Sequence, residues 1–366
     1  MRYRTWLLAA VMAVTGAIVF AGCGGDDNGG GGGSSSSSGG GSKGKIAVLL
    51  PDSKSSVRWE TVDRPFLKKA FDAAGIQNEI QNAEGDKATQ QQQAEQAITN
   101  GAKVILLVNL DSGSGAAIAS NAKSRGVKVI DYDRLTLKGD SDYYVSFDNT
   151  QVGKLQGQGL VKCLGNTNGK SIAELNGSPT DNNATLFKNG YDSVLNPLYD
   201  AGKLKKVADQ SVPDWDNQKA LTIFEQMLQK AGNKIDGVLA ANDGLGNAAI
   251  SALKQRKLPQ IPVTGQDATL QGIQNIVNGD QCMTVYKAIK KEADAAAKIA
   301  IDLINGKTPS VSDKIDNGSK TIPAQFETPV AVTKDNIKDY IGEPDFPKRE
   351  EICAGKLASK CKAIGL

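Results

Sequence analysis

The sequence predicts an α/β protein built of two doubly wound, parallel-sheet lobes that are joined by a hinge. Two observations carry this prediction. Short apolar runs alternate with stretches of helical spacing, and 366 residues are too many for one ordinary domain. Hydrophobic residues make up 40% of the chain and charged residues 23%, which is the balance of a globular protein. The candidate strands are numerous enough to be divided between two sheets rather than placed in one.

The candidate strands all lie between residues 45 and 286. Several are continuous apolar runs, such as residues 104–108, as expected for parallel strands that helices cover on both faces. Three apolar stripes of helical spacing end at Gly75, Gly101 and near Gly232, which are ordinary helix stop signals. Alternation of strand and helix predicts right-handed crossovers. The candidate strands are 45–50, 78–82, 103–109, 128–133, 143–147, 171–175, 205–210, 236–240, 261–265 and 282–286.

The N-terminal residues 1–22 are expected to be an export signal. Two arginines precede an apolar stretch that is too short for a comfortable transmembrane helix. The sequence Phe20-Ala21-Gly22-Cys23 resembles the lipobox of bacterial lipoproteins, in which cleavage precedes a cysteine that becomes lipid-modified. Residues 23–44 continue as a Gly/Ser-rich tether. We therefore expect an exported body anchored to the outer face of the cell membrane through lipidated Cys23. The alternative is an ordinary secretory signal with a stray cysteine.

Composition excludes several classes of function. The chain has no histidine, which excludes a Ser-His-Asp or Cys-His pair, a His general base and a His-ligated metal site. Lys and Arg number 43 against 40 Asp and Glu, so the formal charge of +3 gives no electrostatic argument for nucleic-acid binding. No phosphate-binding loop and no GxGxxG after a strand occur, so no nucleotide cofactor is expected.

Four further cysteines follow Cys23. An even number in an exported chain predicts two disulfides, with three possible connectivities. Cys353 and Cys361 form the favoured local pair, which leaves Cys163 with Cys282. Buried free thiols are the alternative.

Polar side chains and tryptophans follow nearly every candidate strand. Ligands of doubly wound sheets lie beyond the carboxyl ends of the strands, so these side chains would converge on one cleft if the two lobes face each other. Taken singly, Asn and Asp at such positions also serve as helix N-caps or turn formers, and the cations as solvated surface charges. The candidate ligand-binding residues are Arg58, Trp59, Asn109, Asp133, Arg134, Asn182, Asn183, Trp215, Asn242, Asp267 and Lys287.

The chemistry of this set suits a neutral, polyhydroxylated ligand. A sugar hydroxyl both donates and accepts hydrogen bonds, so it suits Asp as acceptor, Arg and Lys as donors, and Asn as both. Charged partners make the stronger hydrogen bonds. The less polar face of a pyranose ring packs against a flat aromatic side chain such as Trp. The residues themselves thus predict a sugar site.

Several of these segments are similar to those of the periplasmic sugar-binding proteins of type I fold, and more narrowly to the D-xylose-binding proteins of ABC transporters. The similarity runs from about residue 45 to about residue 340 and includes each proposed site loop. The segments that carry it are Tyr132-Asp133-Arg134, residues 146–149 with 152–156, Gly177-Ser178-Pro179-Thr180-Asp181-Asn182-Asn183-Ala184, Asn242-Asp243, Gly265-Gln266-Asp267-Ala268 and Met283-Thr284-Val285-Tyr286-Lys287.

The resemblance implies a monomer that captures a monosaccharide, most closely the pentose D-xylose, by hinge closure and delivers it to ABC permease subunits. It implies no catalysis and no cofactor. The N-terminal lobe would comprise 45–149 plus about 285–322, the C-terminal lobe 150–284 plus about 323–345, and a Cys-containing tail 346–366. The sequence departs from the xylose pattern where Asn109 and Leu110 replace a Pro-containing loop, which leaves the identity of the sugar open.

Two other functions are compatible with parts of this sequence pattern. Transcription regulators of the LacI type share this sugar-binding body, but they need an N-terminal helix-turn-helix where this chain has a signal and a Gly/Ser tract. An exported sugar-active enzyme could use paired carboxylates such as Asp133 and Asp267. Against it, Arg134 and Lys287 are expected to hold those carboxylates ionised as hydrogen-bond acceptors.

Overall fold

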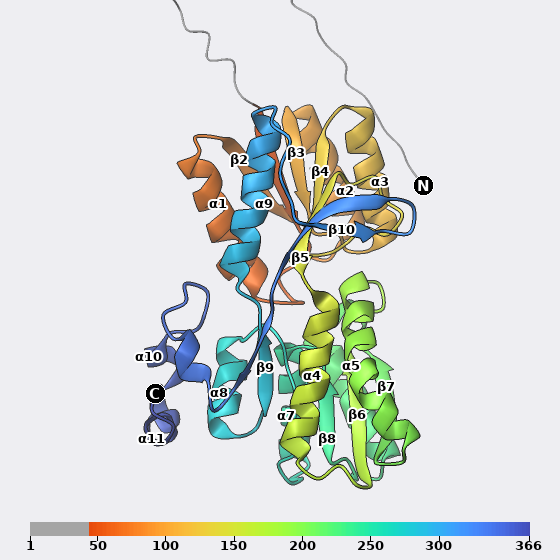
Figure 1. Ribbon diagram of the computed structural model, residues 1–366, viewed down its shortest axis with the longest axis vertical. Helices are drawn as coiled ribbons and strands as arrows, with labels where there is room; N and C mark the ends of the chain where they lie inside the picture. The colour runs from red at the N-terminus through yellow and green to blue at the C-terminus, as the bar shows by residue number, and fades with distance from the viewer. Residues whose placement is uncertain (1–43) are drawn as a thin grey trace, which may run out of the picture. The chain divides into compact units, whose positions relative to one another are not determined.

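Three sheets flanked by helices form the core of residues 44–366, which are the residues that the computed structural model describes (Figure 1). The predicted two-lobed α/β fold is confirmed. The strands are β1 (Lys45–Leu50), β2 (Gln77–Asn82), β3 (Ala102–Leu107), β4 (Lys128–Tyr132), β5 (Tyr143–Phe147), β6 (Lys170–Asn176), β7 (Leu204–Ser211), β8 (Gly237–Ala240), β9 (Met283–Tyr286), β10 (Asp313–Asp316), β11 (Thr321–Glu327) and β12 (Val330–Thr333).

Helices follow most strands and cover both faces of the sheets (Figure 1). The α-helices are α1 (Arg64–Ala73), α2 (Lys87–Thr99), α3 (Ser112–Ser124), α4 (Asn149–Leu164), α5 (Asn182–Asp200), α6 (Asn217–Lys230), α7 (Asp243–Gln255), α8 (Leu270–Asn278), α9 (Ile289–Ile304), α10 (Arg349–Ile352) and α11 (Ala358–Ala363). Short turns of other helix types are η1 (Trp59–Asp63), η2 (Pro213–Trp215), η3 (Ile337–Tyr340) and η4 (Gly355–Leu357).

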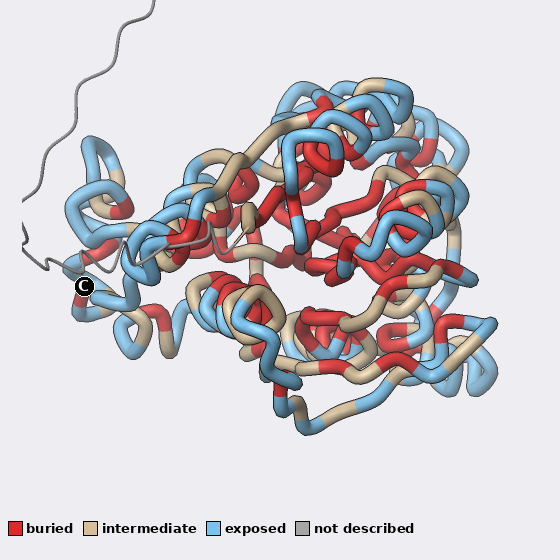
Figure 2. Tube along the Cα trace, turned by 90° about the horizontal axis from the view of Figure 1, so that it is seen from above, coloured by how far each residue is buried: buried red, intermediate tan, exposed pale blue. Residues whose placement is uncertain are grey.

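The N-terminal lobe contains a seven-stranded sheet of order β10-β11-β5-β4-β3-β1-β2. Its central strands are parallel and buried, because the continuous apolar runs of β1 and β3 pack under helices on both sides. Figure 2 shows this pattern, with buried segments inside and exposed ones on the outer turns. The C-terminal lobe contains β7-β6-β8, which is parallel, and the pair β12-β9, which is antiparallel.

The chain passes between the lobes three times, from β5 to α4, from β9 to α9 and from β11 to β12. Two of these crossovers lie side by side, since the Asp148 N–H donates to the Glu327 carbonyl oxygen at 3.2 Å. β11 pairs with β5 as far as Glu327, so the last crossover lies there rather than near the expected boundary at about residue 322. The boundary expected from the sequence lies earlier because β10 and β11, which contain charged residues and a proline, are not recognised as strands from the apolar pattern.

The expected strand at residues 261–265 is not formed. Pro262 lacks an N–H group, and only one parallel bridge joins Val263 to Val238. The hydroxyl of Thr264 replaces part of the missing ladder, because it bonds both the N–H and the carbonyl of Ala240, at 2.9 and 3.0 Å. The segment therefore follows β8 without becoming a strand of its own.

Both disulfides join the cysteines that the sequence analysis paired, Cys163 with Cys282 and Cys353 with Cys361. Residues 346–366, expected as a tail, pack on the C-terminal lobe in one apolar cluster with residues of α8 and β12. The proposed signal, Cys23 and the tether lie outside the described residues. Among the helices of residues 44–366, none has the length and apolar character that a membrane crossing requires.

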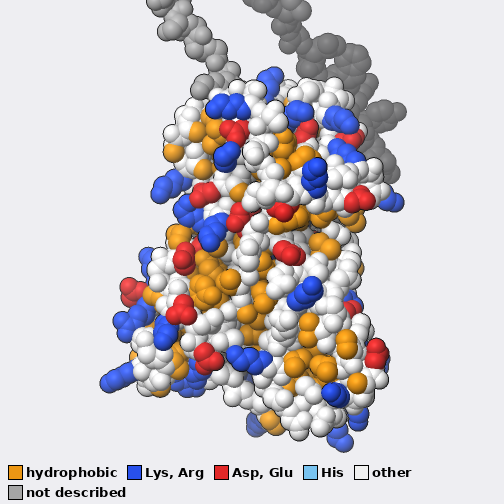
Figure 3. All heavy atoms as spheres, viewed as in Figure 1, with side chains coloured by type: hydrophobic (Ala, Val, Ile, Leu, Met, Phe, Trp, Pro, Cys, Tyr) orange, Lys and Arg blue, Asp and Glu red, His pale blue; other side chains and the backbone are white. Residues whose placement is uncertain are grey.

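Charged side chains of both signs are interspersed on the face shown in Figure 3. This face has neither a basic nor an acidic field of one sign, in keeping with the formal charge of +3 for the whole chain. A mixed surface of this kind gives a solvated exterior and no electrostatic preference for a polyanion.

Helices α4 and α5 approach closely through glycines. A Cβ at Gly153 would lie 1.9 Å from the carbonyl oxygen of Phe187 on α5, and backbone cannot yield as a side chain does. We expect Gly153→Ala to lower the free energy of unfolding by about 2 kcal/mol or more through overpacking, measured by urea denaturation. Gly159→Ala on the same helix is the control, because its Cβ would meet the flexible side chain of Met283. Equal effects of the two variants would contradict the role of backbone contact.

Candidate functional site

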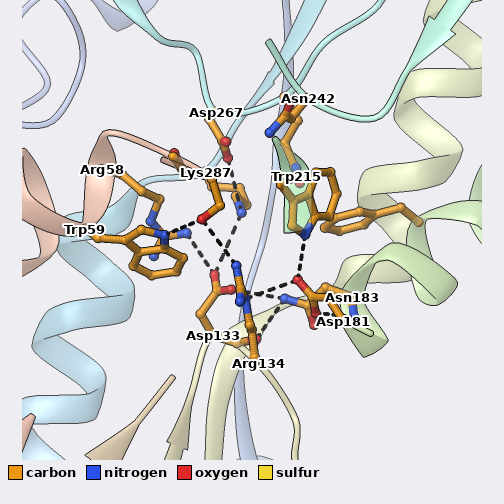
Figure 4. A pocket seen from close by; sticks show the side chains of 14 residues that line it. Arg58, Trp59, Asp133, Arg134, Asp181, Asn183, Trp215, Asn242, Asp267 and Lys287 are labelled. Atoms are coloured by element: carbon orange, nitrogen blue, oxygen red, sulfur yellow. Dashed lines mark hydrogen bonds and ion pairs between the residues drawn. The ribbon is translucent and has the colours of Figure 1, made fainter. Parts of the chain in front are cut away.

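A cavity lies between the lobes and is lined by both (Figure 4). Most of its lining groups follow the carboxyl ends of strands. The exceptions are Trp59 in η1, Asn183 and Phe187 in α5, and Gln266 and Asp267, which follow the non-strand segment 261–265. Nine of the eleven predicted ligand-binding residues are among the lining groups. The lining residues are Ser55, Ser56, Arg58, Trp59, Asp133, Arg134, Asp181, Asn183, Phe187, Trp215, Asn242, Gln266, Asp267 and Lys287.

Two predicted residues do not line the cavity. Asn109 is 2% exposed and lies behind Arg134, where its amide donates to the Arg134 carbonyl at 3.1 Å and to Thr136 Oγ1 at 3.0 Å. It therefore supports the loop that presents Arg134. Asn182 is the half-buried first residue of α5 and lies outside the lining, whereas the next residue, Asn183, reaches the cavity.

Sequence reasoning missed five lining residues: Ser55, Ser56, Asp181, Phe187 and Gln266. Asp181 and Gln266 stand directly beside predicted residues, so the same rule of strand ends could have found them. Phe187 gave no such signal, because an aromatic residue on an amphipathic helix is expected in the core.

Arg58 is the most heavily paired side chain of the N-terminal part of the site. Its guanidinium donates to Asp133 Oδ2 at 2.8 Å, to both oxygens of Asp63 at 2.7 and 2.9 Å, and to Glu292 Oε2 at 2.7 Å. Burial would lower the pKa of Arg58, but the three carboxyl groups raise it well above its ordinary value. Arg58 is therefore a fixed cation that orients Asp133.

Asp133 connects the two lobes. Its backbone is left-handed, with φ of 62°, which turns the residue out of the strand end. Asn183 of the C-terminal lobe donates to the Asp133 carbonyl and to its Oδ1, each at 3.0 Å. Burial would raise the pKa of Asp133, but the charges of Arg58, Lys287 and Arg134 together hold it below its ordinary value. The carboxylate is therefore an ionised acceptor.

Two ion pairs complete the contact between the lobes. Arg134 Nε lies 3.1 Å from Asp181 Oδ2, and both side chains are buried. Lys287 Nζ lies 3.3 Å from Asp267 Oδ1 and 3.8 Å from Asp133 Oδ2, so it stands between one carboxylate of each lobe. These contacts describe a closed arrangement of the lobes around the cavity.

The two tryptophans stand on opposite sides of the cavity (Figure 4). The Arg58 guanidinium lies over the Trp59 ring, 4.3 Å from the ring centroid. Trp59 Nε1 donates a hydrogen bond to Ser55 Oγ at 3.1 Å. Trp215 Nε1 donates to Asp181 Oδ2 at 3.1 Å. A Cβ at Gly177 would lie 2.0 Å from the Trp215 ring, so glycine is needed there for the ring to fit.

Asp243 holds the loop that presents Asp267. Its buried carboxyl accepts hydrogen bonds from Gln281 Nε2 at 2.7 Å, Thr284 Oγ1 at 2.8 Å, and the N–H and hydroxyl of Thr269 at 2.8 and 3.0 Å. The loop needs such support because Asp267 and Ala268 both have positive φ, at 92° and 48°. The anchored turn places Asp267 in the cavity wall.

Two acceptors of this wall receive no hydrogen bond from the described residues. They are Gln266 Oε1 and Asp267 Oδ1, both buried, and the second has only its ion-pair contact with Lys287 Nζ. A buried acceptor without a donor costs free energy, so such groups are typical of a site whose ligand supplies the donor. Hydroxyl groups of a neutral ligand would satisfy both.

Residues 46–308 match the periplasmic binding protein domain family. The chain belongs to that family. It is 40% identical to the D-xylose-binding periplasmic protein of Escherichia coli K12 over 309 residues, which is 84% of this chain and 92% of the relative. It is 35% identical to the multiple sugar-binding periplasmic receptor ChvE of Rhizobium radiobacter over 335 residues, covering 85% and 92% of the two chains.

Solved structures show the same fold. A carbohydrate transporter solute-binding protein of Chloroflexus aurantiacus in complex with D-glucose has a TM-score of 0.76 at 30% identity and covers 82% of this chain and 98% of its own. An ABC transporter solute-binding protein of Clostridium phytofermentans with bound β-D-glucose has a TM-score of 0.78 at 28% identity, with 84% and 99% covered. These relatives are named as sugar-binding proteins, a sugar-binding receptor and solute-binding proteins of transporters, so the chain belongs to a family of sugar-binding transport proteins and not to a family of enzymes.

The ionisation of Asp133 agrees with this conclusion. A glycosidase of the paired-carboxylate type needs one carboxyl group with a raised pKa as general acid. Because three cations lower the pKa of Asp133, that group is unsuited to donate a proton near neutral pH. Together with the family of the chain, this argues against an enzyme in which Asp133 is the general acid.

Asp243 should make stability depend on pH. Burial raises its pKa to about 7, although hydrogen bonds from Gln281, Thr269 and Thr284 oppose the shift. Since an unfolded Asp titrates near about pH 4, the folded chain binds the extra proton, and this stabilisation is present below about pH 4 and lost as the pH rises through about 7. We expect Asp243→Asn, measured by thermal unfolding, to lack this decline. A constant difference in Tm between the two proteins over that range would contradict it.

Proposed function

We propose that this chain is the extracytoplasmic receptor of an ABC sugar importer and holds one monosaccharide, first of all D-xylose, in the cavity between its lobes. The observation that carries the proposal is the convergence of hydrogen-bonding side chains and one tryptophan from each lobe on that cavity. Two D-xylose-binding periplasmic proteins, at 40% and 39% identity, support the choice of sugar.

Different side chains of the site would bind different parts of the sugar. The rings of Trp59 and Trp215 would pack on the two faces of the pyranose. Asp133 and Asp267 would accept from its hydroxyl groups, and Arg134 would donate. A neutral sugar requires no counter-charge, because each charged group of the cavity already has a partner of opposite sign among the described residues.

Binding would proceed by closure of the lobes about the three crossovers. Sugar contacts to both lobes favour the closed arrangement, and only that difference in affinity can drive closure. The closed surface would then be what the permease subunits recognise. We further propose that the protein acts as a monomer, tethered to the outer face of the membrane through a lipid on Cys23.

The first test is calorimetric titration of the purified protein with D-xylose, D-ribose, L-arabinose, D-glucose and myo-inositol. We expect one-to-one binding of D-xylose together with a change in intrinsic fluorescence, because Trp59 and Trp215 both line the cavity. Tight binding of another sugar would support the receptor function with a different specificity, and the loop that presents Arg134, which Asn109 supports, would be the first to examine. A folded protein that binds none of the five would contradict the proposal.

A second test concerns the acceptor at the strained loop. We expect Asp267→Ala to raise the Kd for the bound sugar roughly 10- to 100-fold, since hydrogen bonds to charged groups contribute about 1.5–3 kcal/mol. Asp72→Ala is the matched control, because Asp72 pairs with Lys68 on the exposed side of α1. Unchanged affinity in Asp267→Ala would show that the sugar does not contact this carboxylate.

A further inference from the structure

The C-terminal segment contacts the crossover that carries Lys287 into the cavity. Asp345 accepts a hydrogen bond from the Tyr286 hydroxyl at 2.6 Å through Oδ1, and from the Lys290 backbone N–H at 3.1 Å through Oδ2. Tyr286 is the last residue of β9 in the C-terminal lobe, and Lys290 lies in the first turn of α9, which packs in the N-terminal lobe. One carboxylate thus holds both sides of Lys287.

The contact with Lys290 satisfies a group that α9 cannot satisfy itself. The first N–H groups of a helix have no partner within the helix, and they are usually bonded by the side chain of the N-cap residue. The N-cap of α9 is Ala288, whose side chain accepts no hydrogen bond. Asp345 therefore supplies the cap from a distant part of the chain, with a negative charge that the helix dipole favours at this end.

Aromatic packing keeps Asp345 beside the crossover. The Tyr286 ring meets the rings of Tyr340 and Phe346 edge to face, with centroids 5.5 and 5.3 Å apart. Phe346 follows Asp345 directly and is buried in the apolar cluster of the C-terminal lobe. The buried ring of the next residue therefore keeps the Asp345 carboxylate close to the Tyr286 hydroxyl.

The rest of the segment is fixed to α8. The Cys353–Cys361 disulfide joins the end of α10 to α11. Gln274 Nε2 of α8 donates a hydrogen bond to the Glu351 carbonyl at 2.8 Å. Figure 1 shows α10 and α11 beside α8, below α9. The segment is thus part of the C-terminal lobe. Through Asp345 it bonds the first turn of α9, a helix of the N-terminal lobe.

We propose that Asp345 is a positioning residue for sugar binding, which acts by fixing the path of residues 286–290 and so the place of Lys287. Lys287 Nζ stands between Asp267 Oδ1 and Asp133 Oδ2, one carboxylate from each lobe. A shift of the crossover changes both distances at once. The proposal rests on the proposed function for its effect on affinity, whereas the order of the crossover can be tested without sugar.

The affinity test compares three variants of the protein by titration with D-xylose and D-glucose. We expect Asp345→Ala to raise the Kd roughly threefold to tenfold, because a residue that does not touch the ligand changes its affinity only modestly. Tyr286→Phe, which removes one of the two hydrogen bonds and keeps the ring, should give a smaller increase. Asp339→Ala is the control, because Asp339 is exposed and its side chain bonds no described residue. Wild-type affinity in both test variants would overturn the proposal.

A double-mutant cycle distinguishes positioning from general loss of structure. If Asp345 acts through Lys287, Asp345→Ala should have no further effect on the Kd in a Lys287→Met background, because the group that it positions is gone. An equal effect in both backgrounds would overturn the positioning role.

Amide hydrogen exchange provides the readout that needs no ligand. We expect the amides of residues 286–290, and that of Lys290 above all, to exchange faster in Asp345→Ala than in the wild-type protein or in Asp339→Ala. A wild-type protein that binds no sugar would contradict the proposed function and leave this comparison intact. Unchanged exchange at Lys290 would overturn the inference itself.

Discussion

The rest of the site depends on the charge and hydrogen-bond contacts of the buried Asp133 carboxylate. Removing a carboxylate from water is costly unless cations and hydrogen-bond donors replace the water. Here Arg58 supplies a charged donor from the same lobe, Asn183 supplies an amide from the other lobe, and Lys287 adds a charge from the crossover. Loss of one partner would leave a buried charge poorly compensated. The electrostatics of one residue thus favour the arrangement in which both lobes meet.

This arrangement explains how a heavily charged cavity can receive a ligand without charge. Arg134 is paired with Asp181, and Lys287 with Asp267, so the site is oriented and electrically balanced. Preorganised groups lose little further freedom when a ligand binds. A site of this kind selects by hydroxyl groups, because an analogue that lacks one leaves a buried polar group unpaired. In the proposed site, the side-chain oxygens of Gln266 and Asp267 that receive no hydrogen bond from the described residues would be the acceptors for such hydroxyl groups.

Much of this could be predicted from the sequence, for a physical reason. Continuous apolar runs identify buried parallel strands, and the edge at which those strands end is where ligand-binding side chains gather, so nine of the eleven residues predicted from the sequence line the cavity. The rule fails where hydrogen bonding outweighs the apolar pattern. Pro262 lacks the N–H that a strand would need, and β11 pairs with β5 despite its polar residues. It also cannot tell a lining residue from its support. Asn109 has the position and chemistry of a ligand group, yet it bonds the loop that presents Arg134.

The three crossovers are not equivalent. Among the described residues, only the one from β9 to α9 carries a side chain that lines the cavity, namely that of Lys287. The other two lie against each other through Asp148 and Glu327 and carry none. Opening of the lobes must separate Asp133 from Asp267, so the ammonium between them must leave at least one carboxylate. The hinge and the ligand site therefore share one residue, and whatever fixes its backbone affects both closure and affinity.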